Sequence, residues 1–372
     1  MSTMCRQTNN FAIYGMLQNH LCLNIKTYYP DISPGEIVIR GNKKPKLNKL
    51  SFRFDFEVIS KGNKFGKRGL VIKIPRYPDM QKISVAMSDY TLKKGAKKEF
   101  QALCQLFNYF SSLKDNSLGA IRPLDYIEDL NGIVTEAVSG KNLDKEINKI
   151  SIKIISNKFK KEYLCQHLEC CGRWLRSLHH MPYDETQIVP FDPKEDLQIV
   201  KNILSKLHEY KIKTSFLHFI NDFMQREFNE ISSQFDKKDA VLLHRDFQAR
   251  NILVTDGKIV PFDTDLDKKG LKDRDIAKFI CSLRITKSRL LFDRTLFDHV
   301  LVRKFENIFL SSYFGNNTYS QKILNWYMLW ATLQKWNQFY KIIHLQKGLP
   351  YNVFFRLWVN RIFEDEIVQM LK

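Results

Sequence analysis

The 372-residue sequence lacks any long run of apolar side chains. A helix that crosses a bilayer needs about 20 predominantly apolar residues. The longest candidate, around Ile323 to Leu333, is interrupted by Asn325 and is rich in aromatic rather than aliphatic residues. A basic stretch followed by an apolar segment and a small-residue cleavage site, as in a signal peptide, is also missing from the first residues. We therefore expect a soluble, cytoplasmic protein, with the inner face of the membrane as a place of peripheral contact.

Cysteine pairs suited to metal binding or redox chemistry are missing as well. The seven cysteines are an odd number, and none forms a C-x-x-C pair. Five of them lie in helix-like patterns among apolar neighbours, which favours reduced thiols in a core: Cys104, Cys165, Cys170, Cys171 and Cys281. No repeat period or low-complexity linker is visible either.

Acidic residues are few compared with basic ones, 40 against 59, which gives a net charge of +19. The excess is uneven, because seventeen Lys or Arg residues face four Asp or Glu residues between Arg40 and Lys98. Such a field favours an anionic partner, namely nucleotide phosphates, an anionic membrane face or nucleic acid. A solvated Lys-rich surface explains the same charge equally well.

Alternation of apolar and polar residues predicts a β-rich first part of the chain. Three strands are expected up to Pro75, with the sequences EIVIRG, LSFRFDFEVIS and GLVIKIP, and the second alternates as a half-buried antiparallel strand should. A helix is predicted over Leu92 to Leu113, where apolar residues recur every three or four positions. The segments IRPLDYIED and GIVTEAV predict two further strands, joined by a turn at Asn131-Gly132.

After Gly140 the pattern is almost wholly helical. The exception is the stretch 240–263, a strand, a loop and two strands joined by a hairpin turn at Asp256-Gly257. These patterns predict an α+β, bilobal fold, with a small β-rich N-lobe at 1–138 that carries one helix and a large, mostly helical C-lobe at 139–372. Ligands bind preferentially between such lobes.

The segment from His244 to Asn251, HRDFQARN, fits the kinase catalytic-loop pattern H-R-D-x-x-x-x-N. A short loop of this spacing can aim the carboxylate of Asp246 at a substrate hydroxyl, while the amide oxygen of Asn251 faces a metal bound to the nucleotide. Asp263, at the end of the next strand, would hold Mg²⁺ against the phosphates, as the Asp of D-F-G does. Each residue alone more often caps a turn or bonds loop backbone. The three in order, beside the right strands, favour phosphoryl transfer from ATP.

Upstream residues agree with this interpretation. Lys73 lies mid-strand among apolar neighbours, where its ammonium needs a partner, and LVIKIP is similar to the V-A-I-K strand whose Lys holds nucleotide phosphates. Glu99, on the following helix, is the best partner, although it could be a simple surface charge. The stretch Ile133 to Val138 has the form of a hinge, in which backbone groups of Glu136 and Val138 could pair with an adenine edge; any exposed strand end offers the same groups.

With these motifs, the sequence resembles the aminoglycoside phosphotransferase and choline kinase superfamily, whose members have a protein-kinase-like fold. The likeness spans about Ile37 to Leu283. It includes L-L-H-R-D-x-x-x-x-N-I-L-V, the strand ending in Phe262-Asp263, the helix start D-R-D-I-A at Asp273, and the helix from Gly172 to His179 that ends in L-H. The resemblance implies an enzyme that uses ATP and Mg²⁺ to phosphorylate an alcohol group.

The resemblance also implies a role for each matching residue. It places the nucleotide-binding sheet in the N-lobe and the catalytic loop with the acceptor pocket in the C-lobe. The implied roles are Lys73 on phosphate, Glu99 orienting it, Asp246 as catalytic base, Asn251 and Asp263 on Mg²⁺, and Asp275 as a structural cap.

Three features depart from the family's pattern. Many members have Gly or Asn where Arg245 stands. No G-x-G-x-x-G lies between the first two strands, and Gly41 to Lys44 occupies that place, so the residues that cover the phosphates are open. Asp265 makes a D-x-D with Asp263, and could contact a second metal or only bond solvent.

The spacing of the motifs favours a small-molecule or glycan kinase over a protein kinase. Only eleven residues separate Asp263 from Asp275, without the long activation segment ending in A-P-E that lays out a peptide. The helical stretch between Val138 and His244 would instead wall off a pocket for a compact acceptor. A protein Ser/Thr kinase-like enzyme and a nucleotide-binding pseudokinase remain the alternatives.

The acceptor is poorly encoded in the sequence. Acidic residues that could match a polycation cluster only modestly, at 184–196 and 364–366, so we favour a sugar, a polyol or a lipid-linked saccharide. Peripheral contact with an anionic membrane is a further expectation, and nucleic acid is the least favoured partner. Aromatic residues could stack on sugar or touch a bilayer, although helical spacing more often indicates core packing: Trp326, Trp330, Trp336, Phe339, Tyr340, Phe354, Phe355 and Trp358.

Overall fold

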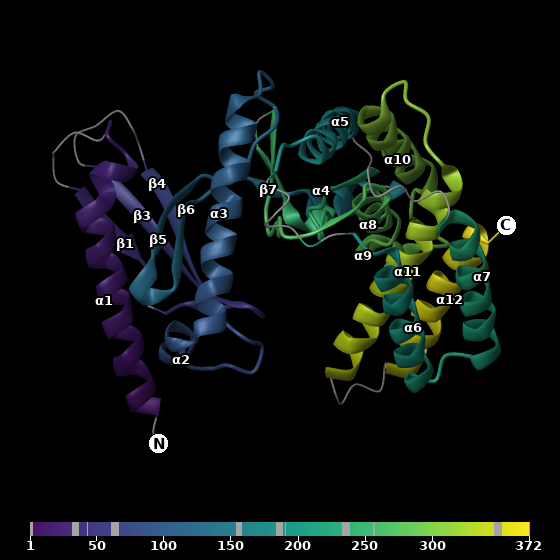
Figure 1. The fold of residues 1–372 in the computed structure, drawn as a ribbon, viewed down its shortest axis with the longest axis horizontal. Coiled ribbons are helices and arrows are strands. Elements are labelled where there is room, and N and C mark those ends of the chain that lie inside the picture. The colour runs from purple at the N-terminus through teal and green to yellow at the C-terminus, as the bar shows by residue number, and fades with distance from the viewer. Residues whose placement is uncertain are drawn as a thin grey trace. The chain divides into compact units, whose positions relative to one another are not determined.

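The chain divides into two compact units (Figure 1). The computed structural model describes residues 3–31, 37–42, 44–60, 67–153, 158–183, 189, 191–232, 239–255, 257–345 and 352–371. The first unit comprises Met1–Lys114 and Gly119–Ser139, and the second Asp115–Leu118 and Gly140–Lys372. The main division falls one residue from the expected boundary, and the short segment Asp115–Leu118 belongs with the second unit. Within the described ranges, no helix is long and apolar enough to cross a membrane.

An antiparallel sheet forms the centre of the first unit. Its strand order is β1 (Ile37–Gly41), β3 (Ser51–Ser60), β4 (Lys67–Pro75), β6 (Gly132–Glu136) and β5 (Pro123–Ile127), and the short β2 (Lys46–Leu47) pairs with β3. The alternation of β3 is reflected in its burial, because Phe52, Phe54, Phe56 and Val58 are buried while Arg53 and Glu57 are exposed. All five main strands occur where the sequence predicts them.

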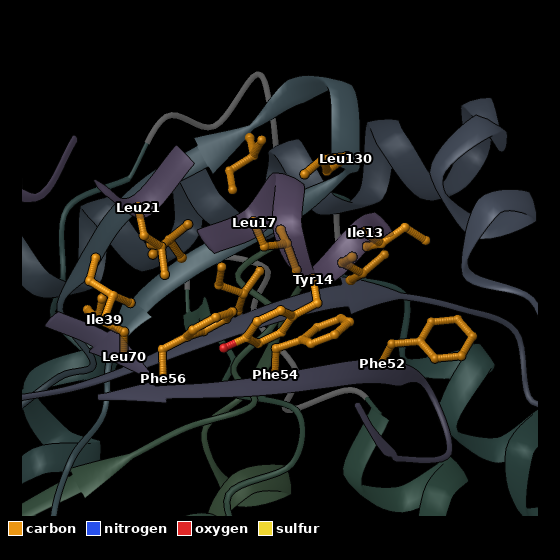
Figure 2. Packing of buried hydrophobic residues seen from close by; sticks show 14 of the residues in the cluster. Ile13, Tyr14, Leu17, Leu21, Ile39, Phe52, Phe54, Phe56, Leu70 and Leu130 are labelled. Atoms are coloured by element: carbon orange, nitrogen blue, oxygen red, sulfur yellow. The ribbon is translucent and has the colours of Figure 1, made fainter. Parts of the chain in front are cut away.

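In the described part of this unit three helices accompany the sheet, so the prediction of a single helix is wrong. They are α1 (Thr3–Tyr28), α2 (Ile83–Ser88) and α3 (Tyr90–Ser112), of which α3 is the predicted one. Figure 2 shows apolar residues of α1 packed against the phenylalanines of β3. The ring of Tyr14 stacks on Phe56 with centroids 5.3 Å apart, and Gln18 Nε2 donates to the Ile39 carbonyl oxygen at 2.8 Å. Side-chain burial and hydrogen bonds to β1 therefore both hold α1 on the sheet.

The second unit is mainly helical, as the sequence predicts. Its helices are α4 (Leu143–Ile150), α5 (Lys158–His179), α6 (Pro193–Glu209), α7 (Thr214–Ser232), α8 (Asp273–Arg284), α9 (Lys287–Phe292), α10 (His299–Phe314), α11 (Gln321–Leu345) and α12 (Asn352–Met370). One small sheet has the order β10 (Lys258–Pro261), β9 (Ile252–Thr255) and β7 (Lys141–Asn142), and β11 (Lys269–Leu271) pairs with β8 (Ala240–Leu242) in another. In the expected hairpin turn between β9 and β10, Gly257 has φ +71°, whereas Asp256 lies outside the described residues.

Close helix packing forms the core of this unit. Helix α5 packs on α10 and α8 packs on α11. A Cβ atom on Gly172 of α5 would meet the Phe309 carbonyl oxygen of α10 at 2.6 Å, so this crossing requires glycine. The aromatic residues of α11 belong to the core, as their helical spacing favoured: Trp326, Trp330, Trp336 and Tyr340 are all at most 2% exposed. The side chains of Phe354 and Phe355 lie outside the described part.

Candidate active site

The predicted catalytic carboxylate and metal ligands lie around the β9–β10 hairpin. The loop before β9 carries Asp246, and Asn251 ends a short 3₁₀ helix (Ala249–Asn251). Asn251 Nδ2 donates to the backbone oxygen of Asp246 at 2.9 Å and to its Oδ2 at 2.7 Å. Across the hairpin, the amide of Phe262 donates to the backbone oxygen of Asn251 at 2.9 Å. This bond sets Asp263 just beyond Asn251, at the same end of the hairpin.

The chemistry of this donor set fits Mg²⁺. Both hydrogen bonds of the Asn251 side chain use its nitrogen, which leaves the amide oxygen to serve as a ligand. Asp263 adds a carboxylate, and hard oxygen ligands are what Mg²⁺ prefers. The described residues hold no group of three or more His, Cys, Asp or Glu side chains placed for a metal. The protein would thus supply few ligands, and phosphate oxygens and water would supply the rest, as is usual for Mg²⁺ with nucleotides.

Helix α8 fixes the backbone of the catalytic loop. The buried carboxylate of Asp275 accepts from the amide of His244 at 2.6 Å and from the amide of Arg245 at 3.0 Å. One turn later, Lys278 Nζ donates to the Arg245 carbonyl oxygen. Ser282 Oγ then accepts from the amide of Ala249 at 3.0 Å. Residues 275, 278 and 282 follow the helical period, so one stripe of α8 satisfies four backbone groups of the loop.

A column of aromatic rings supports the loop from the core. Trp174 of α5 stacks on Phe247 with centroids 5.5 Å apart and an interplanar angle of 7°. His244 meets both rings edge-on, and its Nε2 lies 2.9 Å from Thr264 Oγ1. Phe247 continues the column to Phe279 of α8. The loop is therefore held on its helix side by hydrogen bonds and from the core by ring packing.

Neighbouring charges keep the carboxylate of Asp246 ionised. Burial alone would raise the pKa of Asp246, but Lys278, Arg250 and the Asn251 hydrogen bond outweigh it and hold this pKa below its usual range. Arg250 reaches Asp246 Oδ2 at 3.2 Å, and Gln248 Nε2 donates to Oδ1. Asp246 is thus a hydrogen-bond acceptor at neutral pH, the state a general base needs.

Asp275 belongs to a second buried network. Burial raises its pKa, yet His179, His244 and the His244 amide lower it more, so the pKa lies below the usual range. His179 Nε2 is 3.4 Å from Asp275 Oδ2, and the other ring nitrogen is 2.7 Å from the Tyr313 hydroxyl. Burial lowers the pKa of His179 itself, which favours the neutral imidazole. Helix α5, which carries the L-H motif, therefore ends at His179. This histidine orients the Asp275 carboxylate that anchors the loop.

In the first unit, Lys73 and Glu99 form the predicted pair. Lys73 Nζ of β4 donates to Glu99 Oε1 of α3 at 2.7 Å, and both side chains are about one-quarter exposed (29% and 24%). In the stretch predicted as a hinge, the amide of Glu136 donates to the Arg122 carbonyl oxygen at 2.9 Å, so that donor is used. Val138 follows β6, and its backbone forms no hydrogen bond within the described part of the chain. Contact of these residues with a nucleotide stays a prediction.

The structure also bears on the three departures from the family pattern. Arg245 Nη1 lies 2.7 Å from Asp267 and 3.5 Å from Asp265, so Asp265 is part of a surface ion-pair group beside the loop. Gly41 ends β1 and its carbonyl oxygen accepts from Tyr14, whereas Lys43 of the same stretch lies outside the described residues.

Sequence reasoning missed Lys278, Ser282 and the Trp174 ring. The signal for the first two was their position three and seven residues after Asp275, which places them on the same face of the helix. Trp174 lies in the L-H helix that carried the resemblance, but nothing in the sequence says that it meets Phe247.

Comparison with known proteins shows which solved structures share the fold of this chain. By sequence, no protein-family model and no curated protein matches the chain. A choline/ethanolamine kinase family protein from Mesorhizobium loti is 10% identical with a TM-score of 0.51, over 95% of this chain and 94% of that one. A choline kinase from Cryptosporidium parvum is 12% identical with a TM-score of 0.50, over 96% and 95%. A spectinomycin phosphotransferase determined with ADP and spectinomycin is 15% identical with a TM-score of 0.47, over 93% and 96%. The first two likenesses show that the chain has the protein-kinase-like α+β fold of the superfamily predicted from the catalytic-loop motif.

Proposed function

We propose that this protein is an ATP-dependent phosphotransferase that moves the γ-phosphate to a hydroxyl group of a small molecule or glycan. The observation that carries the proposal is the placement of Asp246, Asn251 and Asp263 around one hairpin, on a loop that α8 anchors by four backbone hydrogen bonds. The fold is that of proteins described as choline and ethanolamine kinases. The presence of all three residues argues against a pseudokinase.

Each residue has a separate task in this reaction. Asp246 would accept the proton of the acceptor hydroxyl and orient it, and its lowered pKa keeps it ionised for this role. Asn251 and Asp263 would hold Mg²⁺, which neutralises charge on the phosphates. Lys73, held by Glu99, would bind nucleotide phosphate, and backbone groups near Glu136 and Val138 would meet the adenine. Preorganisation of the loop by α8 would supply the positioning on which phosphoryl transfer depends.

A compact acceptor suits the second unit better than a peptide does. Between Asp263 and Asp275 the chain forms β11, which pairs with β8 in the register Lys269↔Leu242 to Leu271↔Ala240. This short interval therefore contains a paired strand, and it offers no extended platform for a peptide.

Among compact acceptors, we favour a saccharide, a polyol or a lipid-linked saccharide over a polyamine. A polycation needs carboxylates in its pocket, yet the described acids of the two acidic clusters are largely engaged. Asp196 lies 3.0 Å from Arg274, Glu195 pairs with Lys268, Asp365 lies 3.3 Å from Arg294, and Glu366 binds two arginines of α8 and α9.

The test is a transfer screen with purified protein, Mg²⁺ and labelled ATP. The panel contains hexoses, heptoses, polyols, choline, aminoglycosides and a basic protein. Asp246→Asn is the matched control, and it should lower turnover by about 10²–10⁴-fold while ATP binding is retained. Saturable labelling of protein Ser or Thr, with no transfer to any small acceptor, would sink the proposal and support a protein kinase.

Peripheral contact with an anionic membrane is the finer part of the proposal. Exposed lysines of the basic stretch support it, among them Lys44, Lys46, Lys49 and Lys82. The protein should sediment with vesicles that contain phosphatidylserine, and 0.5 M salt should release it because the attraction is screened. Equal binding to neutral vesicles would contradict an electrostatic attachment.

A further inference from the structure

Arg250 lies on the short 3₁₀ helix of the predicted catalytic loop, between Asp246 and Asn251. Its Nη2 is 3.2 Å from Asp246 Oδ2, and the two side chains are 53% and 36% exposed. Within the described part of the chain, this is the only ion pair that Asp246 forms. The carboxylate that would activate the acceptor hydroxyl therefore has a solvent-exposed guanidinium beside it.

The ion pair alone is a weak reason for an arginine at this position. An exposed pair of this kind adds little to stability, because water screens it and two side chains lose freedom. Asp246 also has other donors, since Gln248 Nε2 donates to Oδ1 and Asn251 Nδ2 donates to Oδ2 at 2.7 Å. The backbone of Arg250 is held separately, because its carbonyl oxygen accepts from Asn142 Nδ2. The loop and the carboxylate are thus held without the guanidinium.

Most of the donors of Arg250 are available to a ligand. A guanidinium has five N–H donors, and an ionised carboxylate has about four lone-pair sites. The contact with Asp246 is the only hydrogen bond that the Arg250 side chain forms with the described residues. On the carboxylate, Asn251 and Arg250 fill Oδ2, whereas Oδ1 accepts from Gln248. The remaining site on Oδ1 can take a hydroxyl proton while the exposed guanidinium lies at the other oxygen.

The transferred phosphoryl group would come close to this guanidinium. In the proposed reaction the hydroxyl oxygen forms a bond to the γ-phosphorus, and the hydroxyl proton goes to Asp246. The bond from the γ-phosphorus to the bridging oxygen breaks, and its electron pair leaves with ADP. A hydroxyl within hydrogen-bond reach of Asp246 and within attack distance of the phosphorus brings that phosphorus within about 7 Å of the carboxylate. Asn251, the residue after Arg250, would bind the Mg²⁺ on the same phosphates.

The transfer of the proton changes the charges around Arg250. Asp246 becomes neutral when it accepts the hydroxyl proton, so Arg250 loses the negative charge of its partner. At the same time, negative charge is spread over three oxygens of the phosphoryl group. A guanidinium can bind two phosphate oxygens through parallel N–H groups. The ion pair of the resting loop can therefore be replaced by a contact with the phosphoryl group as the transfer proceeds.

We propose that Arg250 is a second catalytic residue of this loop, which binds the phosphoryl group during its transfer from ATP to the acceptor. This inference rests on the proposed function and assigns a further residue to the same site. In that function Lys73 and Mg²⁺ bind the phosphates of ATP before the reaction, whereas Arg250 makes its contact in the transition state. A contact of this kind raises turnover without tightening the binding of ATP.

Steady-state kinetics test when the contact is made. Turnover of ATP is measured with the best acceptor of the transfer screen or, if no compound accepts, with water. Arg250→Met should lower kcat by about 10²-fold and leave the KM for ATP within about twofold, because only a transition-state contact is lost. Arg250→Lys should retain part of the rate, since it keeps the charge but not the planar donors. Arg250→Gln replaces the methionine variant if that one does not fold.

Arg294→Met is the matched control. Arg294 Nη2 lies 3.3 Å from Asp365 Oδ2, and these side chains are 52% and 45% exposed, so the pair resembles that of Arg250 in geometry and exposure. Its kinetics should match those of wild type. An unchanged kcat in Arg250→Met overturns the proposal. A raised KM with an unchanged kcat also overturns it, because Arg250 would then bind ATP in the ground state.

A binding experiment separates contact with the phosphoryl group from an effect through Asp246. Calorimetry gives the affinity of ADP with Mg²⁺ in the presence and absence of fluoroaluminate, which resembles the phosphoryl group in transfer. In wild type, fluoroaluminate should tighten ADP by about tenfold or more. Arg250→Met should remove most of this gain, while ADP alone binds as before. The same loss should occur in the Asp246→Asn background, where the carboxylate is absent.

The outcomes distinguish this inference from the proposed function. A gain that is equal with and without Arg250 in the Asp246→Asn background overturns the contact and leaves Arg250 as a partner of Asp246. Absence of any gain in wild type overturns the contact as well. Phosphoryl transfer stands in both cases if wild type turns over ATP and Asp246→Asn does not. Absence of any Asp246-dependent turnover refutes the proposed function, and the role of Arg250 with it.

Discussion

Replacement of Asp275 by Asn should uncouple the catalytic loop from α8. The carboxylate is wholly buried, and its two oxygens accept from the amides of His244 and Arg245 at 2.6 and 3.0 Å. The amide of Asn offers only one acceptor oxygen, and its NH₂ group would face a backbone donor. One loop amide therefore loses its partner, and the charge that strengthens both bonds is removed.

The size of the effect follows from these bonds. A hydrogen bond to a charged group contributes about 1.5–3 kcal/mol, and an unsatisfied buried donor costs about 1–3 kcal/mol. We expect Asp275→Asn to lower the free energy of unfolding by about 2–4 kcal/mol, a large part of the roughly 5–15 kcal/mol of an ordinary domain. Turnover should fall as well, because Arg245 and Asp246 would lose their fixed positions.

Asp273→Asn, two residues earlier on α8, is the matched control. Asp273 is also buried, but burial raises its pKa to about 6, against the lowering effects of Lys272 and a backbone hydrogen bond. Its ionised form is thus unfavourable in the fold, and Asn should be neutral or stabilising at pH 7. The pH dependences have opposite signs. Ionisation of Asp273 lowers the free energy of unfolding as pH rises from its unfolded pKa of about 4 toward 6. Protonation of Asp275 lowers the free energy of unfolding as pH falls below about 4.

Urea unfolding followed by tryptophan fluorescence is the suitable assay. All five tryptophans lie in the second unit, and Trp174 touches His244 and Phe247 of the loop. The midpoint should shift strongly for Asp275→Asn and little for Asp273→Asn at pH 7. Equal midpoints for wild type and Asp275→Asn would refute the anchoring role. The role would also be refuted if the stability of Asp275→Asn fell below pH 4 in the same way as that of the wild type.

Four further substitutions test other parts of the structure. Asp263→Ala should remove the Mg²⁺ dependence of ATP binding, and equal ATP affinity of the wild type with and without Mg²⁺ would contradict the metal site. Lys73→Met should weaken ATP by about tenfold or more through loss of a charged phosphate contact, as measured by calorimetry; an unchanged affinity would remove Lys73 from the nucleotide site. Gly172→Ala should destabilise the second unit by about 1–3 kcal/mol, because its Cβ meets α10 backbone at 2.6 Å. Gly95→Ala in α3, where a Cβ meets nothing within 4 Å, should instead stabilise by about 0.5–1 kcal/mol, and thermal unfolding followed by circular dichroism compares the two.

Local pattern was enough to predict the elements of the sheet and the catalytic loop. The strict alternation of β3 and the spacing of Asp246 and Asn251 are properties of adjacent residues, which a sequence displays directly. The pairing of Lys73 with Glu99 could also be predicted, because a mid-strand ammonium needs an acid and the next helix offers one just before its apolar stripe.

Contacts between distant segments could not be predicted in the same way. Helix α1 carries apolar residues every four positions, at Ile13, Leu17, Leu21 and Ile25, but the motifs of the fold begin only at Ile37. Trp174 and Phe247 are far apart in the chain, and no local rule brings their rings together. The aromatic residues of α11 are the opposite case. Their helical spacing alone favoured positions in the core, and the structure places them there.

The backbone conformation at two positions of the loop explains why the short motif depends on contacts with distant parts of the chain. Arg245 has φ +68° and Asp263 has φ +56°, left-handed conformations that cost an ordinary residue about 1–2 kcal/mol each. Arg245 is held there by Asp275 at its amide and Lys278 at its carbonyl, both from α8. Asp263 is flanked by the Phe262 amide bonded to Asn251 on one side and by Thr264 against His244 on the other. A peptide with the same loop sequence but without α8 would relax out of this shape. The motif therefore marks a fold that can hold strained backbone, and the geometry of the loop is a property of the second unit as a whole.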